Sequence, residues 1–202
     1  FTDGSCSKNG QKQASAGIGV YFYNSDIENI SEKIDGKQTN NTAELKAIKK
    51  AIELSEDLLK QNKKVLIVSD SEYSIRCCTS YGEKNMKTGW TKDIPNKELV
   101  KQLFTIILNY KEQIFFKHVF SHTGKEDFFS KGNNIADNLA NQAVGEISND
   151  TRKEKIYLKV PYDKKDFAKL HGAKWDFKKK KWFLDNNVSI EDKKLLIDLF
   201  FQ

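Results

Sequence analysis

The sequence contains few cysteines and no long apolar run. Its three cysteines are Cys6, Cys77 and Cys78; their spacing matches no metal-binding motif, and their number fits no complete disulfide framework. No apolar run approaches the roughly 20 residues that a membrane helix needs, and the first residues do not form a signal peptide. We therefore expect an intracellular protein that is not secreted and has no membrane partner.

Basic residues are unevenly distributed along the chain. Residues 1–150 contain 20 Lys+Arg and 20 Asp+Glu and carry no net charge, whereas residues 151–202 contain 14 and 8 and carry the entire excess of +6. A basic segment joined to a neutral one suggests a polyanionic partner that is held by the C-terminal part. A solubilising surface would give the same charge, so charge alone leaves both readings open.

The length of 202 residues fits one full domain and a small second one. We expect a domain at 1–146, a polar linker at 147–154 and an α+β module at 155–202. Hydrophobic periodicity predicts strands at 16–23, 29–34, 64–70 and 114–119, and helices at 42–60, 71–79, 97–109 and 133–144. This order predicts a mixed α/β sheet packed with helices. The module pattern predicts a strand at 156–160, a helix at 164–170, short strands around Trp175 and Trp182, and a helix at 190–201.

Four acidic residues lie where such a fold brings chain segments together. We place Asp3 at the end of a short first strand, unless the natural protein has further N-terminal residues, and Glu44 at the start of a helix. Asp70 ends a buried strand, and Asp137 lies in the first turns of the last helix. Singly, each is explained by a turn, a capping box, an N-cap or the helix dipole. Together, the four would repel one another unless Mg²⁺ or Mn²⁺ neutralised them, which indicates a two-metal site.

Ordered motifs surround these carboxylates. They are Thr2-Asp3-Gly4-Ser5, Asn40-Asn41-Thr42-Ala43-Glu44, Ser69-Asp70-Ser71, Ser121-His122-Thr123-Gly124, and Gly132-Asn133 with Ala136-Asp137. Residues 1–145 thereby resemble type 1 ribonucleases H of the eukaryotic and viral kind. The resemblance implies an RNase H-like fold, with a mixed five-stranded sheet flanked by helices. It also implies an endonuclease that hydrolyses the RNA strand of RNA–DNA hybrids and leaves 5′-phosphate and 3′-hydroxyl ends, in the cytoplasm, the nucleus or a virus-infected cell.

The resemblance also implies roles for individual residues. Asp3, Glu44, Asp70 and Asp137 would hold two Mg²⁺ ions, for which Mn²⁺ can substitute, and no small-molecule cofactor is expected. His122 would assist proton transfer and product departure, although the segment that separates it from Asp137 is longer than in the commonest members. His118 and His171 lack such a motif and are interpreted as structural.

The same resemblance predicts contacts with the hybrid. Small polar groups would sense the 2′-hydroxyls of the RNA strand, others would bind the DNA-strand phosphate, and an aromatic residue would lie in a segment that grips the DNA. The predicted contacts with the RNA strand are Asn9, Asn40 and Asn41. The predicted phosphate contacts are Lys37, Thr39 and Asn96, and the aromatic residue is Trp90. The alternative is that the Asn and Thr residues are only turn formers and helix caps.

The C-terminal module resembles a small domain found beside primase-like and other DNA-processing modules of phages, plasmids and large DNA viruses. Its lysines could neutralise phosphates, and its aromatic residues could stack on bases. For Trp175 and Trp182 we favour a place in the core of the module. The predicted basic patch consists of Lys174, Lys178, Lys179, Lys180 and Lys181.

Two further interpretations stay open. One is a hybrid-binding module of the same fold that no longer cuts, and the other is an integrase or resolvase. The complete set of acidic residues argues against the first, and their order, with Glu44 at the start of a helix, argues against the second. We expect a monomer.

Overall fold

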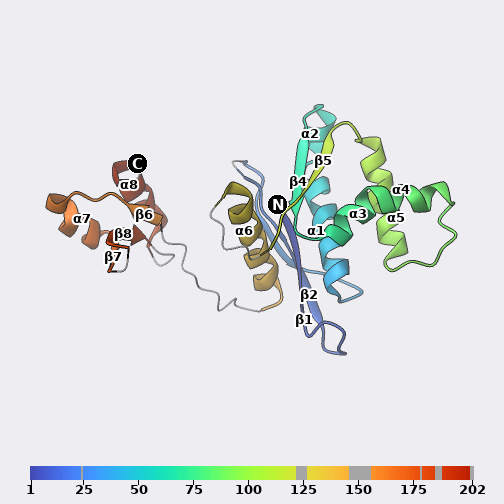
Figure 1. Ribbon diagram of the computed structural model, residues 1–202, viewed down its shortest axis with the longest axis horizontal. Helices are drawn as coiled ribbons and strands as arrows, with labels where there is room; N and C mark the ends of the chain where they lie inside the picture. Colours follow the sequence, from blue (N-terminus) through green and yellow to red (C-terminus); the bar gives the residue numbers. More distant parts are fainter. Residues whose placement is uncertain (24, 122–126, 146–155, 178, 185–187, 201–202) are drawn as a thin grey trace. The chain divides into compact units, whose positions relative to one another are not determined.

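The computed structural model describes residues 1–23, 25–121, 127–145, 156–177, 179–184 and 188–200 (Figure 1). The chain divides into two compact units, Phe1–Ser148 and Asn149–Gln202. Most of the predicted linker at 147–154 lies outside the described residues, so its boundaries stay predictions. In the described part of the chain, no helix is both long and apolar enough to cross a bilayer.

The N-terminal unit is built on five strands. Three of them, β1 (Thr2–Ser7), β2 (Ser15–Val20) and β3 (Ile30–Lys33), form an antiparallel ladder in that order. The other two, β4 (Val65–Ser69) and β5 (Ile114–His118), pair in parallel, and β4 lies beside β1. Parallel and antiparallel pairs therefore occur together, which confirms the predicted mixed α/β architecture.

Helices cover these strands and complete the core. They are α1 (Asn40–Leu54), α2 (Glu56–Lys60), α3 (Glu72–Cys78), α4 (Ser80–Lys87), α5 (Lys97–Asn109) and α6 (Phe128–Ala143). Apolar residues of α1, α3 and α5 pack on β4 and β5 in one buried cluster, including Leu45, Ile48, Ile67, Cys77 and Leu103. The helix predicted at 97–109 is confirmed residue for residue.

The observed helices differ from the predicted ones at three places. The single helix expected at 42–60 is divided at Ser55, whose backbone leaves the helical conformation. Helix α4 was not expected, because its sequence is only eight residues long and largely polar. Helix α6 begins at Phe128 rather than near 133, since the Asp127 carboxylate caps it by accepting hydrogen bonds from the backbone N–H groups of Phe129 and Ser130.

Close packing on both faces of the β1–β2 ladder fixes the helices that carry acidic residues. Both α1 and α6 contact β1 and β2, and Figure 1 shows them on opposite sides of these strands. At Gly19 of β2, an added Cβ would collide with the backbone of α6 at Ala136 and Ala140. The absence of a side chain at this position therefore sets how closely α6 approaches the sheet.

The C-terminal unit is a small α+β structure, as expected. Strands β6 (Ile156–Leu158), β8 (Lys181–Leu184) and β7 (Lys174–Asp176) form an antiparallel sheet in that order. A 3₁₀ turn (Tyr162–Lys164) leads into α7 (Lys165–Leu170), and α8 (Ile190–Phe200) ends the described chain. Its core contains Leu158, Ala168, Trp182, Leu184 and Leu196.

The packing of α6 on β2 predicts the effect of a single methyl group. We expect Gly19→Ala to lower the free energy of unfolding of the N-terminal unit by about 1–3 kcal/mol, because the obstacle is backbone rather than a mobile side chain. Thermal unfolding followed by circular dichroism measures the change. Lys12→Ala, at an exposed turn position, should stay within about 0.5 kcal/mol of the parent; equal losses for both variants would contradict the explanation.

Candidate metal centre

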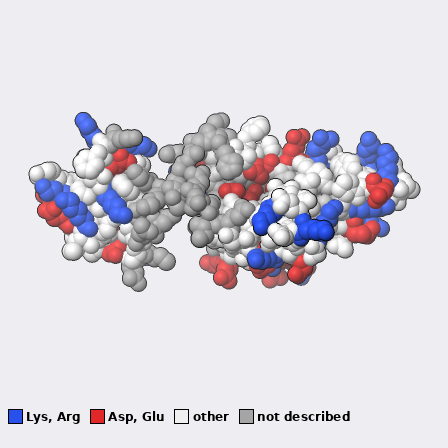
Figure 2. Space-filling view, turned by 90° about the horizontal axis from the view of Figure 1, so that it is seen from below, with Lys and Arg blue, Asp and Glu red and all other residues white. Residues whose placement is uncertain are grey.

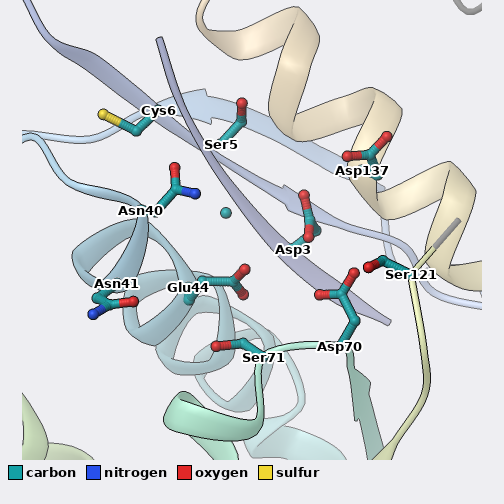
Figure 3. A pocket seen from close by; sticks show the side chains of 11 residues that line it. Asp3, Ser5, Cys6, Asn40, Asn41, Glu44, Asp70, Ser71, Ser121 and Asp137 are labelled. Carbon is teal, nitrogen blue, oxygen red and sulfur yellow. The ribbon is translucent and has the colours of Figure 1, made fainter. Parts of the chain in front are cut away.

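Carboxylates from three chain segments converge where β1 and β4 lie side by side. Asp3 comes from β1, Glu44 from α1, and Asp70 directly follows β4. One carboxylate oxygen from each of the three lies within 4.8 Å of the other two. Asp137, on α6, lines the same cavity of about 360 Å³, and Figure 3 shows it across from Asp3. The four residues singled out from the sequence thus line one cavity.

Two of the four occupy their elements differently from the prediction. Asp3 is the second residue of β1, which continues to Ser7, so it lies near the start of the strand and not at its end. Asp137 is the tenth residue of α6 and lies in its middle, because the helix begins five residues earlier than expected. Neither difference removes the side chain from the cavity, which both Asp3 and Asp137 line.

Glu44 reaches the cluster because α1 begins almost in contact with β1. A Cβ at Gly4 would collide with the backbone of Ala43 and Glu44. The side chain of Thr39 caps the helix by accepting a hydrogen bond from the Thr42 N–H at 3.2 Å. Gly4 and the Thr39 cap together bring the first turns of α1 close to β1, so that the Glu44 carboxylate lies near that of Asp3.

Burial and mutual repulsion disfavour ionisation in this cluster. Asp3 is 6% exposed and Glu44 9%. Burial, and then the charges of Asp70 and Asp137, raise the pKa of Asp3 well above its usual value. Burial, followed by the charges of Asp3 and Asp70, raises the pKa of Glu44 in the same way. The Gly4 N–H donates to both carboxylates and offsets part of the rise. A positive charge in the cavity would stabilise both ionised forms.

Asn133 orients Asp70 from the neighbouring helix. Its side-chain amide donates a hydrogen bond of 3.0 Å to the Asp70 carboxylate, and the residue is 2% exposed. It lies four residues before Asp137 on α6, hence one turn away on the same face. A single helix therefore supplies one carboxylate of the cavity and fixes the direction of another.

The donors present fit a hard divalent cation. One buried oxygen of Glu44, Oε2, has no hydrogen-bond partner, although buried acceptors are nearly always satisfied. Carboxylate oxygens from three or four side chains are the ligands that Mg²⁺ and Mn²⁺ prefer. A cation bound here would satisfy this oxygen and neutralise the repulsion within the cluster.

The predicted nucleic-acid contacts fall into two groups around this site. Asn40 and Asn41, both exposed in the first turn of α1, line the cavity. The hydroxyls of Thr39 and Thr42 lie 2.7 Å apart, and Thr42 donates to the Asn96 side chain at 3.0 Å. Two residues of the predicted phosphate pocket, Thr39 and Asn96, are thus joined through Thr42; the third, Lys37, is exposed nearby in sequence.

The structure places the remaining candidates as follows. Asn9 is exposed in the turn between β1 and β2 and does not line the cavity. Trp90 is partly buried against the core cluster, so part of its ring serves packing. His122 and Lys178 lie outside the described residues. His118, interpreted as structural, has its ring Nε2 3.1 Å from the Asp70 carbonyl oxygen.

Some site residues escaped the analysis of the sequence. Ser5, Cys6, Ser71 and Ser121 also line the cavity, and small polar residues beside acidic ones carry little signal of their own. Asn133 was quoted only as part of a motif. Its spacing of four residues from Asp137 on one helix could have identified it as a member of the site.

The raised pKa values predict how stability depends on pH and metal. Because the folded-state pKa of Asp3 and Glu44 exceeds the unfolded value, the folded state binds more protons. The stabilisation that these two protonated carboxyl groups give the folded state is present at low pH and is lost as the pH rises through their folded-state pKa. In EDTA we therefore expect the Tm of the N-terminal unit to fall from about pH 5 to 8, and Mg²⁺ to raise Tm more at pH 8 than at pH 5.

The Asp70→Asn variant tests the cause. Removal of one charge should raise the metal-free Tm at pH 8 by roughly 2–4 °C per kcal/mol of relieved repulsion, and should reduce the Mg²⁺-dependent gain. Scanning calorimetry measures both, with Asp57→Asn on α2 as the control for loss of an exposed carboxylate. A Tm that is indifferent to Mg²⁺ at every pH would contradict the metal assignment.

Solved structures share this fold. The solution structure of the PFV RNase H domain superposes with a TM-score of 0.55 at 24% identity, over 71% of this chain and 92% of that one. A structure of the foamy viral protease-reverse transcriptase in complex with dsDNA gives 0.56 at 25% identity, over 71% of this chain and 90% of that one.

Curated relatives are more similar in sequence. The "Probable ribonuclease H" of Acanthamoeba polyphaga mimivirus is 37% identical over 71% of this chain and 65% of its own. "Ribonuclease H1" of Rattus norvegicus is 36% identical over 71% of this chain and 49% of its own, and "Ribonuclease H" of Schizosaccharomyces pombe is 36% identical over 72% and 52%. The chain thus spans between about half and two thirds of the length of these relatives.

Two different families match the N-terminal and the C-terminal parts of the chain. Residues 155–194 match a family described only as a domain of unknown function (DUF5710). Residues 1–145, which contain all four carboxylates, match the family described as RNase H. With this match, the fold and the relatives in agreement, the chain belongs to the RNase H family.

Proposed function

We propose that the chain is a metal-dependent endonuclease that hydrolyses the RNA strand of RNA–DNA hybrids and leaves 5′-phosphate and 3′-hydroxyl ends. The convergence of Asp3, Glu44 and Asp70 within 4.8 Å, with Asp137 in the same cavity, is the observation that carries the proposal. The relatives named ribonuclease H support the same activity.

The four carboxylates that line the cavity would hold two Mg²⁺ ions. Asp3, in the centre of the cluster, would be shared by both ions, with Asp70 on the side of the nucleophile, and with Glu44 and Asp137 for the other ion. Metal ions held by these carboxylates would supply Lewis-acid activation of a water molecule and charge stabilisation at the leaving 3′-oxygen. The Asp3 and Glu44 carboxylates have to be deprotonated for this, which metal binding and the Gly4 N–H both favour.

The side chains around the carboxylates would hold the metal ligands in position. Asn133 holds the Asp70 carboxylate in one direction with its 3.0 Å hydrogen bond, so that this ligand needs little reorganisation when substrate enters. His122, outside the described residues, stays the predicted proton carrier.

Selection of the hybrid would depend on polar residues beside the cavity. Asn40 and Asn41 line it and are exposed, which suits amide contacts with 2′-hydroxyls in a minor groove. The linked side chains of Thr39, Thr42 and Asn96, with the Lys37 ammonium, offer donors for a phosphate of the DNA strand. Asn9 and Trp90 would extend these two contacts to either side.

Cleavage of an end-labelled RNA–DNA hybrid tests the function. We expect the purified protein with Mg²⁺ to cut only the RNA strand of the hybrid, and to leave matched RNA and DNA duplexes intact. EDTA and Asp70→Asn should each remove the activity, the latter by at least about 10³-fold, because a metal ligand is lost.

Asp57→Asn, on the exposed side of α2, is the matched control and should cut at the parental rate. A protein that binds the hybrid but cuts no strand in Mg²⁺ or Mn²⁺ would establish the alternative, a silent hybrid-binding module.

Asn133→Ala tests the positioning of Asp70. Loss of its hydrogen bond should reduce the apparent affinity for Mg²⁺, or the rate at saturating Mg²⁺, by about 10–100-fold. Titration of hybrid cleavage against Mg²⁺ separates the two effects. Asn134→Ala, the exposed neighbour on α6, should behave like the parent; if both variants match the parent, Asn133 has no positioning role.

A further inference from the structure

Several large side chains of the C-terminal unit are exposed although its core is complete without them. Leu158, Ala168, Leu184 and Leu196 are at most 3% exposed, and Trp182 is 8% exposed among them. By contrast, Tyr162 is 82% exposed and Trp175 is 39% exposed. The sequence-based expectation that both tryptophans lie in the core is thus met by Trp182 and only partly by Trp175.

Lysines lie over two aromatic rings of this unit, the exposed Tyr162 and the buried Trp182. The Lys165 ammonium is 3.9 Å from the centroid of the Tyr162 ring, and the Lys169 ammonium is 5.9 Å from that of Trp182. The Trp182 ring in turn meets Trp175 edge to face, with 5.4 Å between centroids. Because Lys165 and Lys169 are four residues apart on α7, they share one face of the helix. Contacts therefore connect Tyr162, Lys165, Lys169 and Trp175 into one surface, the aromatic–lysine track.

We propose that the aromatic–lysine track binds single-stranded nucleic acid. Lysine ammonium groups neutralise phosphates, and exposed aromatic rings stack on bases whose faces are free. A duplex keeps the faces of its bases inside the stack, so exposed rings would gain little from it. The net charge of +6 on residues 151–202 favours a polyanion, and Figure 2 shows lysines spread over the visible face of this unit, with acidic side chains between them.

The composition of the track argues against a protein partner. Lysine is depleted in the buried centres of protein–protein interfaces, whereas here lysines alternate with the aromatic residues. Acidic residues also lie beside the track: Asp163 and Asp176 adjoin Tyr162 and Trp175 in the sequence, and Asp166 lies 3.6 Å from the Lys169 ammonium. Both partners of that pair are more than half exposed, so the pair is weak and can exchange for a phosphate. The proposal does not depend on hydrolysis by the N-terminal unit.

Binding of a fluorescein-labelled oligo(dT) of about 20 nucleotides to the full chain, followed by anisotropy at several salt concentrations, tests the track. Tyr162→Ala should raise Kd about fivefold to tenfold without changing the salt dependence, since stacking is lost and no charge is removed. The double variant Lys165→Ala/Lys169→Ala should weaken binding and lower the slope of log Kd against log salt by about 1.4, or 0.7 per phosphate contact on a single strand.

The matched control is Lys193→Ala/Lys194→Ala, which removes the same charge from α8 of the same unit. It should leave Kd within about twofold of the parent, and circular dichroism should show every variant folded. The proposal is overturned if Tyr162→Ala binds oligo(dT) like the parent, or if an equally long DNA duplex binds as tightly as the single strand. Hybrid cleavage at saturating substrate is measured separately, so that loss of catalysis and loss of strand binding are distinguished.

Discussion

Electrostatic repulsion among buried carboxylates is the constraint around which the N-terminal unit is arranged. One carboxylate oxygen from each of three acidic side chains lies within 4.8 Å of the other two, where burial and neighbouring negative charges raise the free energy of ionising Asp3 and Glu44. Packing has to hold them there: α1 approaches β1 at Gly4, and α6 approaches β2 at Gly19. The stability of the surrounding core thus maintains an arrangement that is unfavourable until a cation enters, a common property of functional sites.

The same repulsion would explain why the proposed strand binding is assigned to one unit and the proposed hydrolysis to the other. A cavity of carboxylates repels a phosphate backbone in the absence of metal, and residues 1–150 have no net charge with which to attract one. Under these proposals, long-range attraction of a nucleic acid would come from residues 151–202, which carry the whole excess of +6.

Sequence predicted the elements better than their ends. Strong apolar periodicity located α5 exactly, and ordered motifs located all four carboxylates. The break at Ser55 and the early start of α6 at Asp127 were missed, because both depend on local hydrogen bonding that periodicity does not encode. The role of Asn133 was missed because it is a tertiary contact with Asp70, 63 positions away. Spacing indicated which residues belong together, and only packing showed how they are held.

Gly4 has a consequence for how this site can change during evolution. The two nearest atoms that exclude a side chain there belong to the backbone of Glu44 and Ala43, and no substitution at a neighbouring position can remove backbone atoms. A larger residue at position 4 therefore has no compensating partner. Asp3 and Gly4 would therefore be inherited together, Asp3 for its carboxylate and Gly4 because it has no side chain. A lineage that lost the glycine would have to change the backbone at the start of α1 before Glu44 could again reach the cavity.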